Sequence, residues 1–264
     1  MTSNDVPTDQ TFFLRDGDRF VPTIYTHSAW DPNGMRGGAV SGLLMHAIED
    51  RHVDDAFQVT RFTVDMFRMA PKIPSTVRTT VVREGNRIRV VDATLIADGL
   101  EVARASVVML RRTDPPEGTS WSPPTWDVPH PDTIAALSGG DGRLAIWEQR
   151  NIAGQIGRDA MQKRAWLRTC TAFVDDAPAS DLVRAAIVSD YANPLSNSGD
   201  RGLNYVNADI TLYMHRVPAG EWIGVEVASH HAEQGIAVGE CALYDLDGAF
   251  GRTTVSSIGN RRRT

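Results

Sequence analysis

The chain has 264 residues, 42% of them hydrophobic, and a net charge of −6, which suits a globular protein with one large core or two smaller ones. The negative charge, with a single basic cluster at residues 261–263, argues against a nucleic-acid partner. Its apolar runs are far shorter than the roughly 20 residues of a membrane-spanning helix, and no charged-then-apolar leader opens the chain, so we expect a cytoplasmic protein without a membrane span.

The N-terminal half is predicted to contain one helix followed by antiparallel strands. A short strand is expected at residues 19–26. Apolar residues then recur at spacings of three and four from Gly38 to about Asp50, which is typical of a helix with one face against a sheet. The following strands are expected at residues 58–68, 75–84, 87–97 and 100–111, with a hairpin turn at Asp98-Gly99 before the last of them.

A proline-rich segment interrupts this pattern. Six prolines lie between Thr113 and Pro131, and the apolar alternation stops there. This composition is typical of a linker. We therefore predict an N-terminal domain at residues 1–112, a linker at 113–145 and a C-terminal domain at 146–264.

The C-terminal half repeats the order of elements found before the linker. A strand at residues 163–173 is followed by a helix from Ser180, a plausible N-cap, to about Ala192. Further strands are expected at residues 203–216, 221–230, 236–245 and 249–258. The segment 66–71 parallels 213–218, since each closes a strand with proline, and the turn at 97–99 parallels that at 246–248. The same elements in the same order indicate a duplicated domain.

One helix for every four or five strands is too few for a doubly wound fold. An antiparallel sheet with a single long helix buries most apolar surface by curling around that helix, which is the hot-dog arrangement. We therefore predict an α+β double hot-dog, with two antiparallel sheets each wrapped around one long central helix. The open sheet edge of each half is available to be covered by the other half.

The two predicted helices differ in where they place a carboxylate. In the first helix, Glu49 falls nearly opposite the apolar stripe, whereas in the second helix Asp190 lies on the stripe that Val183 and Ile187 define. A buried carboxylate without a charged partner has a raised pKa or must be held by hydrogen bonds. Asp190 is therefore either a general base that holds water, or a residue of the fraying last turn that bonds a backbone N–H. Only the second half is expected to hold a working site.

Four segments carry a resemblance to a known family: residues 36–40, 164–168, 189–191 and, most specifically, 208–216. On these segments the sequence resembles the type II acyl-CoA thioesterases, tandem hot-dog proteins of bacteria and peroxisomes, over nearly its whole length. The resemblance implies hydrolysis of a fatty acyl-CoA of medium or long chain, with CoA as part of the substrate. It also implies a homo-oligomer.

The family positions an attacking water with an aspartate, a Ser or Thr, and a Gln. The aspartate matches Asp190, while the other two positions fall on Asn207 and Ser256, which both retain hydrogen-bonding groups. Thr211 lies on the same strand face as Asn207 and is the alternative hydroxyl. Asn207 falls on the polar face of its strand, so it is a surface residue unless a bulge near the strand start turns it towards the helix.

The remaining chemistry of thioester hydrolysis is assigned to the start of the first helix. The backbone N–H groups around Gly37 and Gly38 lack partners within the helix, so they are candidate donors to the carbonyl oxygen as it becomes negative. Glycine there also lets the substrate approach closely. The alternative interpretation of this glycine pair is a tight turn into a helix.

Two other functions remain open. Residues 190–195 are similar to a hydratase signature, although the spacing is one residue longer and Ser196 replaces its histidine, and a non-catalytic acyl-CoA or lipid-binding protein is the third possibility. A serine hydrolase is excluded because no nucleophile elbow is present. The two cysteines, Cys170 and Cys241, offer no paired zinc ligands, so we expect neither a metal nor a cofactor.

Overall fold

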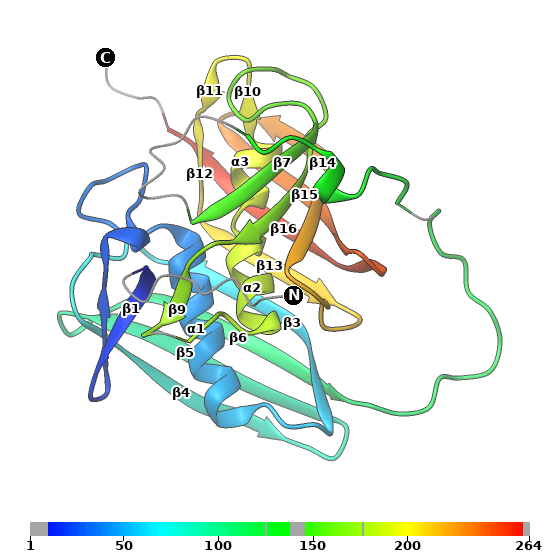
Figure 1. The fold of residues 1–264 in the computed structure, drawn as a ribbon. Coiled ribbons are helices and arrows are strands. Elements are labelled where there is room, and N and C mark those ends of the chain that lie inside the picture. Colours follow the sequence, from blue (N-terminus) through cyan, green and yellow to red (C-terminus); the bar gives the residue numbers. More distant parts are fainter. Residues whose placement is uncertain (1–9, 125, 138–145, 176, 261–264) are drawn as a thin grey trace.

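The computed structural model describes residues 10–124, 126–137, 146–175 and 177–260 (Figure 1). The N-terminal half contains β1 (Thr11–Asp16), β2 (Arg19–Pro22), the 3-10 helix η1 (Ile24–Thr26), α1 (Gly37–His52), β3 (Phe57–Met66), β4 (Ser75–Glu84), β5 (Ile88–Ala97) and β6 (Leu100–Arg111). The C-terminal half contains η2 (Pro131–Thr133), β7 (Trp147–Ala153), β8 (Arg164–Thr169), β9 (Ala172–Val174), α2 (Asp181–Ser189), α3 (Ala192–Ser196), β10 (Ser198–Gly199), β11 (Gly202–Leu203), β12 (Tyr205–Asn207), β13 (Asp209–Met214), β14 (Trp222–Glu233), β15 (Ile236–Asp245) and β16 (Gly248–Gly259).

All described strands except β10 and β11, which pair only with each other, form one continuous sheet, so the prediction of two sheets each wrapped around its own helix was wrong. In the described residues it has 14 strands in the order β7-β8-β14-β15-β16-β13-β3-β6-β5-β4-β2-β1-β9, with β12 also paired to β16. The two halves join where β3 and β13 pair antiparallel, with Thr63 opposite Thr211, and also where β1 pairs with β9 in parallel. The physical reason is that an edge strand carries unpaired backbone groups, and each half supplies the partner for the other.

The helix of the second half is shorter than predicted. Its start is confirmed, because Ser180 is the N-cap of α2 and its Oγ accepts a hydrogen bond from the Val183 N–H at 3.1 Å. Pro194 has no N–H to bond the Asp190 carbonyl, so the regular hydrogen-bond ladder stops there. The Asn193 N–H reaches that carbonyl at 3.1 Å instead, and the chain continues as the short α3. Within the described residues, α1, with 16 residues, is the one long central helix.

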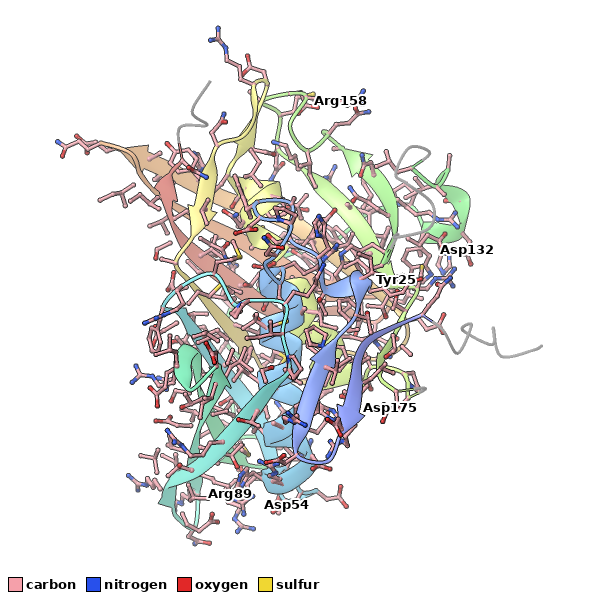
Figure 2. All side chains as sticks on the ribbon, turned by 90° about the vertical axis from the view of Figure 1, so that its left-hand side faces the viewer. Tyr25, Asp54, Arg89, Asp132, Arg158 and Asp175 are labelled. Carbon is pink, nitrogen blue, oxygen red and sulfur yellow. The ribbon has the colours of Figure 1, made fainter. Side chains whose placement is uncertain are left out.

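Helix α1 lies between the sheet and α2 (Figure 1). Its predicted apolar stripe is confirmed, since Leu43, Leu44 and Ile48 have no exposed surface. At the end of α1, Arg89 of β5 donates to Asp54 at 2.9 Å and so ties the following loop to the sheet (Figure 2). The position of α1 is thus fixed by packing along its length and by an ion pair at its end.

The predicted linker packs partly on the outer face of the C-terminal half. The Trp126 ring stacks on Tyr244 of β15, with centroids 4.2 Å apart, and its Nε1–H donates to Glu226. A Cβ on Gly224 would overlap the Trp126 ring, so glycine at this position of β14 makes room for it. This part of the linker is therefore anchored to the sheet.

Candidate active site

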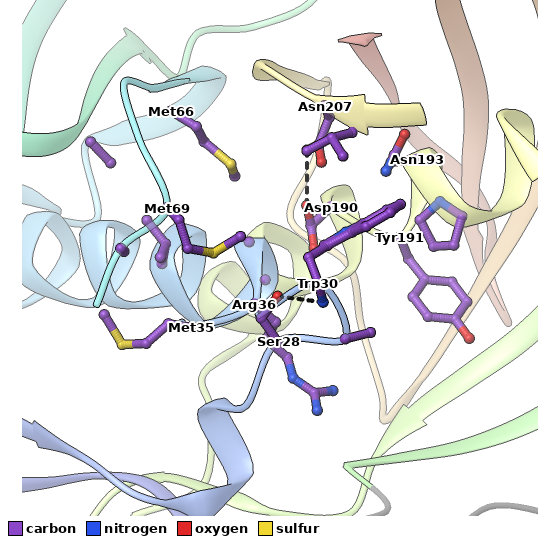
Figure 3. Close-up of a pocket in the computed structure, with 18 of the residues that line it drawn as sticks. Ser28, Trp30, Met35, Arg36, Met66, Met69, Asp190, Tyr191, Asn193 and Asn207 are labelled. Carbon is purple, nitrogen blue, oxygen red and sulfur yellow. Dashed lines mark hydrogen bonds between the residues drawn. The ribbon is translucent and has the colours of Figure 1, made fainter. Parts of the chain in front are cut away.

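A cavity of about 560 Å³ lies between the start of α1, the break between α2 and α3, and strand β12. Both halves of the chain contribute to its walls (Figure 3). The polar side chains and backbone groups that line it include those of Arg36, Gly37, Gly38, Asp190, Tyr191, Asn193 and Asn207. The cavity therefore exists only because the two halves pack together.

Asp190 is held by groups from both halves. It is the C-cap of α2, and its Oδ1 accepts a hydrogen bond from Asn207 Nδ2 at 3.0 Å (Figure 3). Burial raises the pKa of the Asp190 carboxyl above its ordinary value, while the Asn207 amide, the Gly38 backbone N–H and the Arg36 charge oppose that shift. The result is an oriented carboxyl group with an unusually high affinity for a proton.

Gly37 and Gly38 place the start of α1 directly against Asp190. A Cβ on Gly37 would overlap Asp190 Oδ1 and would lie 2.8 Å from the Met66 methyl group. A Cβ on Gly38 would lie 3.0 Å from the backbone oxygen of Ile187. The Gly37 N–H, in the first turn of the helix, has no acceptor among the described residues and is available to a bound molecule.

Asn207 faces the helix because the strand is irregular just after it. Asn207 pairs with Ser257 of β16, whereas Thr211 pairs with Thr254, so four steps on one strand (211 − 207) oppose three on the other (257 − 254). The extra residue is Ala208, which separates β12 from β13. This is the bulge that the sequence analysis left as an alternative, and it turns Asn207 towards Asp190.

Ser256 and Thr211 do not line the cavity. The Asp209 carboxylate accepts hydrogen bonds from both the backbone N–H and the hydroxyl of Ser256. The Thr211 hydroxyl lies 3.3 Å from that of Thr63, across the junction of the two halves. Of the six predicted site residues, the structure brings together Asp190, Asn207 and the two glycines, and it places Ser256 and Thr211 elsewhere.

Glu49 is more buried than the sequence indicated. It is half-buried, accepts a hydrogen bond from Ser180 Oγ at the start of α2, and has a pKa raised by burial, an effect that the Ser180 hydroxyl opposes. Glu49 is half-buried because α2 covers the face of α1 that lies opposite the sheet. Glu49, in the last turn of α1, thus contacts the start of α2, just as Asp190, at the end of α2, contacts the start of α1. Unlike Asp190, Glu49 does not line the cavity.

Arg36 is a cavity residue to which sequence reasoning gave no role. It is half-buried, and its Nε donates to the His27 carbonyl at 2.9 Å. Burial lowers the pKa of its guanidinium, and the nearby Asp190 charge opposes that effect. The signal that marks it in the sequence is its place at the N-cap of α1, where Ser, Thr, Asp or Asn is usual, and it makes no side-chain capping bond.

A buried polar network holds α3 beside the cavity. Asn193 Nδ2 donates to the Tyr205 carbonyl at 3.2 Å, and its Oδ1 accepts from Asn197 Nδ2 at 2.9 Å and from Ser257 Oγ at 3.2 Å. Since Tyr205 and Asn207 belong to the same short strand, this network also fixes the strand that presents Asn207.

Among the described residues, no three His, Cys, Asp or Glu side chains are placed to hold a metal ion together. Within the same ranges, no helix combines the length and the apolar character needed to cross a membrane.

Two family models match the chain. The model described as acyl-CoA thioesterase N-terminal domain matches residues 26–110, and that described as acyl-CoA thioesterase C-terminal domain matches residues 114–254. None of the curated proteins compared with the chain matches it.

Several solved structures are similar over almost their whole length. The tesB protein of Mycobacterium avium subspecies paratuberculosis is 15% identical with a TM-score of 0.72, and 96% of each chain is covered. A conserved protein with a hot-dog fold from Alicyclobacillus acidocaldarius is 18% identical with a TM-score of 0.73 and 98% coverage of both chains. An acyl-CoA thioesterase II from Mycobacterium marinum is 15% identical with a TM-score of 0.65, covering 90% of this chain and 97% of that one.

At these identities the structural likeness shows the fold, which is the hot-dog fold. The family models show the family, which the fold alone does not, because together they match well over half of the residues. The chain therefore belongs to the acyl-CoA thioesterase family and is a thioester hydrolase.

Proposed function

We propose that the protein hydrolyses a fatty acyl-CoA of medium or long chain to the free acid and CoA, with a water molecule activated by Asp190. The observation that carries this proposal is the Asp190 carboxyl, which is held by Asn207 at 3.0 Å in the wall of a cavity of about 560 Å³. A carboxyl fixed by an amide and a backbone N–H has its free lone pairs oriented, as a general base requires.

In the proposed reaction the water oxygen attacks the thioester carbonyl carbon while Asp190 accepts a proton from that water. The carbonyl oxygen becomes negative and is stabilised by the Gly37 N–H and the positive end of the α1 dipole. The carbon–sulfur bond then breaks, and the CoA thiolate takes the proton back from Asp190. The raised pKa of Asp190 supports both steps, because it strengthens the base and still allows the proton to be returned. The reaction consumes only water and needs no cofactor.

The acyl chain is proposed to lie along the apolar wall of the cavity. That wall is rich in flexible and small side chains, including Met35, Met66, Met69, Ala70 and Ala103. Methionine adapts its shape to irregular apolar ligands. This lining supports an alkyl chain rather than a polar group as the neighbour of the methionines.

The proposal is tested by measuring thiol release from a panel of straight-chain acyl-CoAs by the purified full chain. We expect release with medium or long chains and its loss in Asp190→Asn. Absence of thiol release at every chain length would contradict hydrolysis. Hydration of an enoyl-CoA in the same panel would favour a hydratase, and binding without either reaction would favour a non-catalytic acyl-CoA-binding protein.

A further inference from the structure

A second cavity, of about 540 Å³, is bounded by other residues of the elements that bound the active-site cavity. In α3, Asn193 lines the active-site cavity and Ser196 the second one; in β12, Asn207 lines the first and Tyr205 the second. The other walls of the second cavity are the β10–β11 hairpin, which lies beside α3 (Figure 1), the segment before β8 and the middle of β14. The two cavities have no lining residue in common.

Lys163 is a nearly buried cation in the wall of the second cavity. It is only 4% exposed, and its stem packs closely on Gly154, where a Cβ would lie 2.9 Å from Lys163 Cγ. Its Nζ donates to the Ser198 carbonyl at 2.9 Å and to the Met161 carbonyl at 3.3 Å, and no carboxylate in the described ranges forms an ion pair with it. Lysine is seldom buried this deeply without an acidic partner, and an ammonium group has three N–H donors. One donor and the charge therefore remain for a ligand.

Ser198 contributes a hydroxyl group without a partner to the same wall. The residue is 6% exposed, and its Oγ makes no hydrogen bond to any described residue. Its carbonyl accepts from Lys163 Nζ, so the hydroxyl and the ammonium group belong to adjoining parts of the wall. A buried hydroxyl left without a hydrogen bond costs free energy, which a ligand that accepts from it would recover.

The ionisable side chains of this cavity favour an anion. Its described lining holds Lys163, His230 and the exposed Arg201, against the one exposed carboxylate of Asp200. The His230 ring is oriented by Asn197, whose Oδ1 lies 2.9 Å from His230 Nδ1. A phosphate group presents several acceptor oxygens, so it can accept from an ammonium group and a hydroxyl at the same time. A single chloride ion would satisfy these donors less well.

We propose that the second cavity binds a phosphate group through Lys163 and Ser198, at a site separate from that of the acyl-CoA substrate. The ligand class is a small phosphate-bearing molecule, since a volume of about 540 Å³ lies within the range of small-molecule sites. This site goes beyond the proposed hydrolysis, because neither Lys163 nor Ser198 lines the active-site cavity.

Titration with inorganic phosphate tests the proposal without any use of the reaction. Calorimetry on the purified full chain, at constant ionic strength maintained with chloride, is expected to show saturable binding with a Kd of about 1 mM or tighter. Absence of saturable binding would overturn the proposal. The titration is then repeated with the chain saturated by CoA, and we expect the same Kd. Displacement of phosphate by CoA would show that the substrate's own phosphates occupy the cavity, and it would overturn the claim of a separate site.

Variants then assign the binding to the two residues. Ser198→Ala removes a hydroxyl that has no partner to lose, so the fold should be kept while phosphate binding weakens at least about threefold. Lys163→Met is expected to weaken it at least about tenfold, because contacts to charged groups are stronger. Ser41→Ala is the matched control, since the Ser41 hydroxyl is likewise buried and has no partner in the described part of the chain, but lines neither cavity. Unchanged binding in Ser198→Ala, or an equal loss in Ser41→Ala, would overturn the proposal.

Discussion

Replacing Asp190 with asparagine separates its chemistry from its structural contacts. The Asp190→Asn side chain is expected to keep an oxygen that accepts from Asn207, whose Nδ2 lies 3.0 Å from Asp190 Oδ1, while losing the ability to take a proton. A positioned general base contributes roughly 10²- to 10⁴-fold in rate. At about 1.36 kcal/mol per tenfold change, this corresponds to roughly 2.7–5.4 kcal/mol of activation free energy. The assay is thiol release at saturating substrate, and a variant retaining more than about a tenth of wild-type kcat would refute the assigned role.

The same variant is expected to reveal the cost of burying this carboxylate. Because the folded-state pKa of Asp190 is raised above its ordinary value, the folded protein binds the proton more tightly than the unfolded chain does. The wild type therefore loses stability as the pH rises from the unfolded pKa, about 3.9, through the folded pKa. Urea unfolding across this window should show Asp190→Asn gaining stability relative to the wild type. A variant that is less stable at every pH would indicate that the carboxylate is structural.

Four further variants test the site and the packing of the helices beside it. Asn207→Ala removes an amide that lowers the Asp190 pKa, so the acidic limb of the kcat/KM profile should move to higher pH; an unmoved limb would separate the two residues. Gly37→Ala should reduce kcat because its Cβ overlaps Asp190, whereas Gly42→Ala, whose Cβ would lie 2.7 Å from Ile187 Cγ1, should cost about 1–3 kcal/mol of unfolding free energy with unchanged turnover of the folded fraction. Thiol release and urea unfolding measured on both variants check this contrast, and equal turnover would contradict it. Glu49→Gln should keep turnover and unfold at higher urea concentration at neutral pH, since burial raises the Glu49 pKa; a loss of thiol release would instead reveal a second site.

Local features of this protein could be predicted from its sequence because they depend on neighbouring residues. The N-cap at Ser180 is confirmed. So is the hairpin turn between β5 and β6, where Asp98 and Gly99 take φ values of 50° and 72°. The apolar stripe of α1 and the place of Asp190 on the buried side of its helix were predicted from helical periodicity. Each of these features is encoded within a few residues of chain, where propensity and spacing are informative.

The contacts between the halves were decided only by the tertiary structure. Periodicity shows which face of an element is apolar, but it does not show which strand edge meets which. The pairing of β3 with β13 therefore turned two predicted sheets into one. Periodicity also does not show that α2 covers the face of α1 that carries Glu49. Nor does it show that the Asp209 carboxylate accepts a hydrogen bond from Ser256.

The residues of the cavity were likewise predicted in part from the sequence and decided in part by the tertiary structure. Its carboxylate was visible in the sequence because a charged residue on an apolar stripe is unusual. The sequence left two interpretations of Asn207, a surface residue or a site residue. The extra residue at Ala208 turns Asn207 towards the cavity. Arg36 had no role assigned from the sequence, and packing placed it at the cavity and near the Asp190 charge. Sequence determined which groups each half presents, and the packing of one half on the other determined which of them meet.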